Sequence, residues 1–147
     1  MLTQLPPKQT ITVRLPLPPA QRAAYERAER AGIIQLRQHG ETLRIAHILE
    51  LITRLKQLCN RDPVSGESAK LADIRERLQT LIAEGHRALL FSQYTDDRFG
   101  VAAAARHLTA ANPLTYTGAL SGSARDAVIQ RFKSDPRPQA PILSLRA

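Results

Sequence analysis

Two short polar segments of this sequence stand where a protein can hold a phosphate. Ser92 and Gln93 end the mostly apolar run that begins at residue 87, and ligands of parallel sheets bind at the carboxyl ends of the strands. Ser121, Gly122 and Ser123 precede an expected helix, whose free N–H groups attract anions and whose glycine permits close approach. Each segment has a plainer interpretation, because polar pairs also close turns and serine is a common helix N-cap.

Arg125 falls in the first turn of that expected helix. A cation is disfavoured there by the helix dipole. Its presence indicates a partner, which is either a bound anion or an acidic side chain, with Asp126 and Asp97 as the candidates in this chain.

The side chains that ordinarily perform catalysis are scattered along the chain. Cys59 is the only cysteine, which excludes an internal disulfide and leaves a metal site without thiol partners. No glycine is directly followed by lysine, and no Asp-Glu pair occurs. We therefore assign no catalytic residue and no metal site. The histidines occur singly, without the spacing of ligands or of a triad: His39, His47, His86 and His107.

Length and charge exclude several classes of protein. The chain has 147 residues, 43% of them hydrophobic, which predicts one globular domain with a real core. No apolar run is long enough to cross a membrane, and the N-terminus lacks the apolar core of a signal peptide, so we expect a cytoplasmic protein. The net charge of +8 is divided equally between the two halves. Because 17 of the 21 basic residues are Arg, genome composition explains this charge as readily as nucleic-acid binding does.

Helical patterns dominate the first half of the sequence. Residues 11–15 alternate apolar and polar, which predicts a strand that the following prolines end. Residues 20–30 are strong helix formers. Between residues 43 and 58, apolar residues recur at intervals of three and four and predict a helix with one apolar stripe. Residues 60–68 are rich in turn formers and predict a loop.

The second half alternates helices and strands. A helix with apolar residues from 71 to 82 should end at Gly85, and it is followed by expected strands at 87–92, 114–117 and 141–145. Helices are expected between them, at 97–111 and 124–133. Strands separated by helices of this length imply a parallel sheet covered by helices. Because the apolar run 141–145 is typical of an interior strand yet only two residues follow it, we expect this chain to be part of a longer protein.

Five groups of residues occur in an order and at spacings that are specific to one family. In sequence order they are 5–8 with Gln21 and Tyr25; 55–60 with Pro63 and 68–71; 88–95; 116–118 with Arg125 and Phe132; and 142–147. Together they resemble the SWI/SNF-type double-stranded DNA translocases of the helicase-like ATPase superfamily, in which 88–95 resembles motif IV and 142–147 the opening of motif V.

The resemblance implies an α/β fold: an incomplete, three-layer RecA-like parallel sheet preceded by a strand and a helical hairpin. Residues 1–18 would be an inter-lobe linker strand, 19–68 a helical inter-lobe insertion, and 69–147 part of the C-terminal RecA-like lobe. Arg146 would couple DNA contact to the nucleotide cleft. The implied DNA-binding residues are Ser92, Gln93, Gly118, Ser121, Gly122, Ser123, Arg125 and Ser144.

The implied function is part of an ATP-driven motor on double-stranded DNA. Its further partner would be the missing N-terminal RecA-like lobe, with no membrane partner, and a bacterial protein would act at the nucleoid. ATP and Mg²⁺ would bind the complete motor, and neither would bind this chain alone, because the phosphate loop, the Asp-Glu pair and motif VI lie outside it.

The sequence also departs from the family's pattern. Arg61 and Asp62 precede Pro63 where the family has a histidine, so no role for that histidine is carried over. The alternative function is a non-catalytic helical and α/β interaction module, or a gene remnant. A small phosphate-binding enzyme is a third hypothesis, which the absent catalytic constellation weakens.

Overall fold

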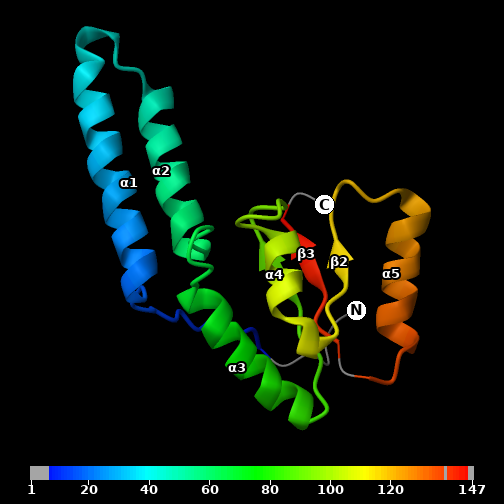
Figure 1. The fold of residues 1–147 in the computed structure, drawn as a ribbon. Helices are drawn as coiled ribbons and strands as arrows, with labels where there is room; N and C mark the ends of the chain where they lie inside the picture. Colours follow the sequence, from blue (N-terminus) through cyan, green and yellow to red (C-terminus); the bar gives the residue numbers. More distant parts are fainter. Residues whose placement is uncertain (1–6, 138, 146–147) are drawn as a thin grey trace.

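A helical hairpin forms one side of the molecule in Figure 1, which shows a computed structural model that describes residues 7–137 and 139–145. Helix α1 (Pro19–Gln38) and helix α2 (Ile45–Asn60) are joined through a 3₁₀ turn at Gly40–Thr42. The expected helix at 43–58 is confirmed, whereas α1 continues eight residues beyond the expected end. The two helices pack closely at Gly32 of α1, because a Cβ there would lie 2.2 Å from Leu51 Cδ1 of α2.

The strand expected at residues 11–15 is wrong. Residues 7–18 contain no strand, and the side chain of Ile11 is 81% exposed. A strand requires a neighbour to complete its hydrogen-bond ladder, and no strand of the described chain pairs with this segment. The alternation of apolar and polar residues is therefore not sufficient to form a strand in this segment.

Three short parallel strands form the sheet: β1 (Leu90–Ser92), β2 (Thr115–Tyr116) and β3 (Ile142–Ser144). Their order is β1-β3-β2, so β3 is the interior strand that its apolar run predicts. Leu90 and Thr115 are both in register with Ile142. The α/β fold with an incomplete parallel sheet is confirmed.

Helices lie on both sides of this sheet. Helix α3 (Ala69–Ala83) and helix α4 (Val101–His107) lie on one side, and helix α5 (Gly122–Ser134) lies on the other (Figure 1). Right-handed crossovers require this arrangement, since the chain moves across the sheet in opposite directions through α4 and α5. None of the helices in the described ranges has the length and apolar character that a membrane crossing requires.

The core lies between the sheet, α3 and α4. Its buried side chains come from α3, from α4 and the residues after it, and from β3 and the residue two positions before it: Leu78, Val101, Leu108, Ala111, Ala140 and Ile142. The opposite face of the sheet is more open, because Phe91 is 61% exposed. Helix α4 is shorter than the expected 97–111, since the Asp96 carboxylate accepts from the N–H groups of Arg98 and Phe99 and holds this segment as a turn.

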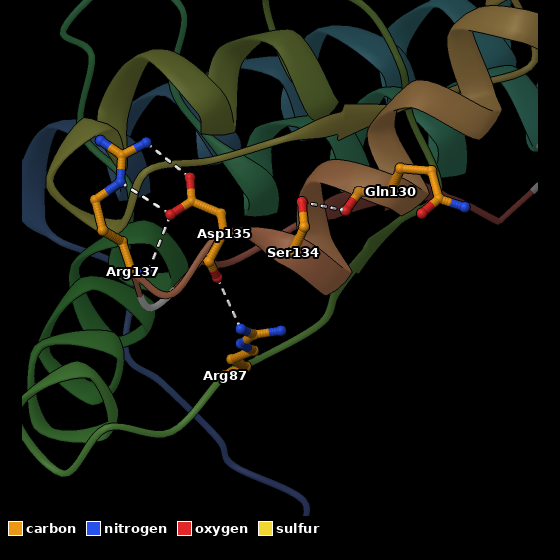
Figure 2. A network of polar contacts seen from close by, with 5 residues as sticks. All are labelled: Arg87, Gln130, Ser134, Asp135 and Arg137. Atoms are coloured by element: carbon orange, nitrogen blue, oxygen red, sulfur yellow. Dashed lines mark hydrogen bonds and ion pairs between the residues drawn. The ribbon is translucent and has the colours of Figure 1, made fainter.

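The amino end of the sheet is held by Arg87, just before β1 (Figure 2). Its Nη1 donates to the carbonyl of Phe132 at 2.5 Å, and its Nη2 donates to the carbonyl of Asp135 at 2.8 Å. The same guanidinium lies 5.3 Å from the centre of the Phe132 ring. Arg137 forms a two-atom contact with the Asp135 carboxylate and holds the pKa of that group far below its usual range. Through its two hydrogen bonds to the Phe132 and Asp135 carbonyls, Arg87 joins the end of α5 to the segment just before β1.

Candidate nucleic-acid interface

The parallel strands bring three of the predicted segments to one end of the sheet. Ser92 and Ser144 are register partners, and the Leu145 N–H donates to the Ser92 carbonyl at 3.0 Å. Gly118 follows β2 by two residues, so it lies at the same end. Ser144 is buried, whereas Gly118 is exposed. This is the end of a parallel sheet at which ligands bind.

Ser92 closes a turn with its own hydroxyl, in agreement with the plainer interpretation of this residue. The hydroxyl donates to the Tyr94 carbonyl at 2.8 Å and accepts from the Tyr94 N–H at 3.2 Å. A Cβ on Gly100 would lie 2.3 Å from the Tyr94 carbonyl, so only glycine allows the start of α4 to approach this turn. The turn presents the side chain of Gln93 to solvent, and within the described chain no hydrogen bond holds that amide.

The segment before α5 is also a helix cap. The Ser121 hydroxyl accepts from the Ala124 N–H at 3.3 Å, and the hydroxyls of Ser121 and Ser123 lie 3.2 Å apart. Both serines and Gly122 are exposed. A Cβ on Gly122 would meet no atom within 4 Å, so packing within this chain does not require glycine there.

Arg125 turns back toward the sheet. Its Nη2 donates to the Gly118 carbonyl at 3.0 Å, and its guanidinium carbon lies 5.8 Å from the centre of the Tyr116 ring. Among the described residues it forms no ion pair with Asp126 or Asp97, which the sequence left open as partners. Its buried Nε has no hydrogen-bond partner in the described chain. Arg146 lies outside the described residues.

A network at the base of the hairpin fixes where this end of the sheet lies relative to α1 and α2. Gln21 is fully buried; its Nε2 donates to the Leu58 carbonyl at 2.7 Å, and its Oε1 accepts from the Ala69 N–H at 3.0 Å. Asn60 Nδ2 donates to the Phe99 carbonyl at 3.3 Å. Three helices and the turn before α4 therefore meet through two amide side chains.

The loop between α2 and α3 is closed by Asp62. Burial opposes ionisation of its carboxylate, but hydrogen bonds from the Ser65 hydroxyl and from the Val64 and Ser65 N–H groups prevail, so its pKa lies below the ordinary value. The charge of Arg27 acts in the same direction. The loop that the turn formers predict is thus built around one ionised aspartate.

Sequence reasoning missed a cavity of about 410 Å³ beside Ser92. It lies between α2, α3, β1 and α4, and its polar lining includes Lys56, Arg61 and Lys70. These cations lie within 15 residues of sequence but come from two helices and the loop between them, so their spacing fits no single helical or strand period that would place them on one surface. In the described ranges, no group of three or more His, Cys, Asp or Glu side chains is placed to hold a metal ion.

Comparison with known proteins finds similar sequences along nearly the whole chain. YwqA of Bacillus subtilis, which carries the name of an ATP-dependent helicase/translocase, is 27% identical over 154 residues that cover 97% of this chain. CHROMATIN REMODELING 4 of Arabidopsis thaliana is 29% identical over 99% of this chain. The chain spans only 16% of YwqA and 7% of the Arabidopsis protein. No protein-family model matches the sequence.

Solved structures show the same fold. The C-terminal domain of a SWI2/SNF2 ATPase from Sulfolobus solfataricus matches 92% of this chain with a TM-score of 0.74 and 22% identity, and the match covers 62% of that domain. The core of the Sulfolobus SWI2/SNF2 ATPase in complex with double-stranded DNA matches 88% of this chain with a TM-score of 0.71 and 21% identity, over 29% of that chain. In sequence and in fold, this chain therefore resembles one segment of the SWI/SNF-type helicase-like ATPases, as its motifs predict.

Proposed function

We propose that this chain is part of an ATP-dependent double-stranded DNA translocase and supplies DNA-facing turns of its second RecA-like lobe. The observation that carries the proposal is the likeness to SWI2/SNF2 ATPases along nearly the whole chain, including a core solved with double-stranded DNA. In this proposal residues 1–18 link the two lobes, 19–68 form the helical insertion and 69–147 belong to the second lobe. The protein would act in the cytoplasm, at the nucleoid in a bacterium.

The turns at the carboxyl end of the sheet would follow the DNA backbone. The exposed Gln93 amide is available to donate to a phosphate oxygen, and so are the N–H groups around Gly122 at the start of α5. Ser92 and Arg125 would act by fixing the turns, since both already bond to backbone carbonyls. Gly118, Ser121, Ser123 and Ser144 complete the proposed contact region, and Arg146 would couple it to the nucleotide cleft. Phosphate contacts carry no sequence information, so binding should be non-specific and sensitive to salt.

The hairpin would transmit movement between the lobes. Gln21 joins the two hairpin helices through the Leu58 carbonyl. The base of the hairpin is joined to the second lobe by the hydrogen bonds of Gln21 to the Ala69 N–H and of Asn60 to the Phe99 carbonyl. The motor's other lobe would hold ATP and Mg²⁺, and hydrolysis there would open and close the cleft. No residue of this chain is assigned to the hydrolysis step.

ATP hydrolysis with and without duplex DNA tests the motor. We expect the full reading frame to hydrolyse ATP faster when duplex DNA is present, and this chain alone to show no turnover. A full-length protein without nucleotide turnover, or a reading frame with no further lobe, would support the non-catalytic interaction module or the remnant instead.

The contact region is tested by a matched pair of glutamine variants of the full-length protein. We expect Gln93→Ala to weaken duplex binding several-fold, because an amide-to-phosphate hydrogen bond contributes about 1 kcal/mol. Gln79→Ala is the control, since Gln79 is an exposed residue of α3. Fluorescence anisotropy with duplexes of two unrelated sequences would measure both affinities at several salt concentrations. Equal affinities for the two variants would remove Gln93 from the interface.

A further inference from the structure

The cavity beside Ser92 has an apolar floor. Helix α3 contributes Leu71 and Ile74, β1 contributes Leu90, and α4 contributes Ala104, with Leu108 just beyond its end. Its volume of about 410 Å³ falls within the roughly 300–1,000 Å³ that is usual for small-molecule pockets. An aromatic ring or a short aliphatic chain can be buried against these side chains.

The polar lining of the same cavity is positively charged. Lys56, Arg61 and Lys70 line it, and no Asp or Glu of the described chain does so. Lys70 Nζ donates to Asn60 Oδ1 at 2.9 Å, and Arg61 Nη1 donates to the Arg98 carbonyl at 3.4 Å. Both partners are neutral groups, so the positive charge is not compensated where apolar walls make it strongest.

Two buried polar atoms on the cavity's lining residues lack partners. Arg61 Nε and Tyr94 Oη are both inaccessible to solvent and have no hydrogen-bond partner in the described chain. A buried donor without a partner costs about 1–3 kcal/mol. Both residues line the cavity, so unused hydrogen-bonding groups lie on side chains that border it.

We propose that this cavity binds a small amphipathic anion, which is an aromatic or aliphatic body that carries a phosphate, sulfonate or carboxylate. The body lies on Leu71, Ile74 and Leu90, and the anionic group lies between Lys56, Arg61 and Lys70. We expect both halves of the ligand to be needed, because the apolar floor offers no polar side chain and a bare ion would leave that floor uncovered. The proposal does not depend on the motor function.

Titration of the chain with 1-naphthyl phosphate tests the proposal. Inorganic phosphate and 1-naphthol, which represent the anionic and the apolar half of that ligand, are titrated separately for comparison. We expect 1-naphthyl phosphate to bind at least tenfold more tightly than either half, by isothermal titration calorimetry. The methyl NMR signals of Ile74 and Leu90 should shift on its addition. Equally tight binding of inorganic phosphate, or of 1-naphthol, would overturn the combined site.

Charge variants on the surface locate the site without altering the core. Lys56→Gln should weaken 1-naphthyl phosphate binding about threefold or more, as the loss of one cation at short range predicts. Lys133→Gln makes the same charge change on exposed α5, outside the cavity, and should have no effect. Equal affinities for the two variants would overturn the proposal. Binding of a DNA duplex is measured on the same samples, so loss of one activity without the other shows which proposal has failed.

Discussion

The two ends of the sheet use their basic side chains in opposite ways. At the amino end, Arg87 donates to two carbonyls and Arg137 pairs with Asp135, so these guanidinium groups serve the fold. At the carboxyl end, Lys56 and Arg61 line a cavity to which no Asp or Glu of residues 7–137 and 139–145 contributes. The net charge, divided equally along the sequence, conceals this difference. Charge points to a ligand only where the structure leaves it uncompensated.

The largest effect should come from the junction that supports the carboxyl end. Replacement of Gln21 by leucine (Gln21→Leu) leaves the Leu58 carbonyl and the Ala69 N–H without their partner. We expect the free energy of unfolding to fall by about 1–3 kcal/mol, measured by urea denaturation at pH 7. Gln35→Leu is the control on the same helix, where the side chain is exposed. If the two variants are equally stable, the junction does not hold the hairpin.

Arg87→Gln tests whether the amino end of the sheet affects stability without affecting ligand binding at the carboxyl end. Arg87 is exposed, so the loss of its two hydrogen bonds and its Phe132 contact should lower the free energy of unfolding by only about 1 kcal/mol. We expect no change in the affinity for 1-naphthyl phosphate. Arg75→Gln, an exposed change on α3, provides the baseline for urea denaturation. Weaker ligand binding by Arg87→Gln would contradict the division between a structural and a binding end.

The smallest effect concerns the acid dependence of stability. Because folding lowers the pKa of Asp62, the unfolded chain binds more protons, and stability falls as the pH drops below the unfolded value of about 3.9 and through the folded one. Asp62→Asn should remove part of this loss, a change of under about 1 kcal/mol. Thermal unfolding between pH 3 and pH 7 measures it. Identical pH profiles for the parent chain and Asp62→Asn would exclude Asp62 as a contributor.

Features that are local in sequence could be predicted well. The apolar stripe of α2 and the uninterrupted apolar run of β3 each follow from a single window, and both elements are present. The resemblance to SWI/SNF-type ATPases also follows from short motifs. Helix α1 was predicted too short, because Gly32 and the two isoleucines after it are poor helix formers. Packing against Leu51 outweighs that preference.

Features that depend on a partner could not be predicted. The alternation at residues 11–15 indicates a strand, but none of the three strands in the described ranges pairs with it. Of the two partners expected for Arg125, an acidic side chain is absent among the described residues, where the guanidinium donates to the Gly118 carbonyl, and a bound anion stays a prediction. The cations of the cavity are up to 14 positions apart, from Lys56 to Lys70, and only the approach of α2 to α3 brings them together. The roles proposed for the DNA-facing turns stay predictions.

Because Gln21 lies at the base of the hairpin, a small change in angle there produces a large displacement at the hairpin's far end. Gln21 lies in the first turn of α1, and the helix continues to Gln38, a distance of roughly 25 Å at 1.5 Å per residue. A tilt of about 10° at that base moves the far end of the helix by roughly 4 Å. The hydrogen bonds of Gln21, with that of Asn60 to the Phe99 carbonyl, therefore help to set the position of a surface far from the sheet.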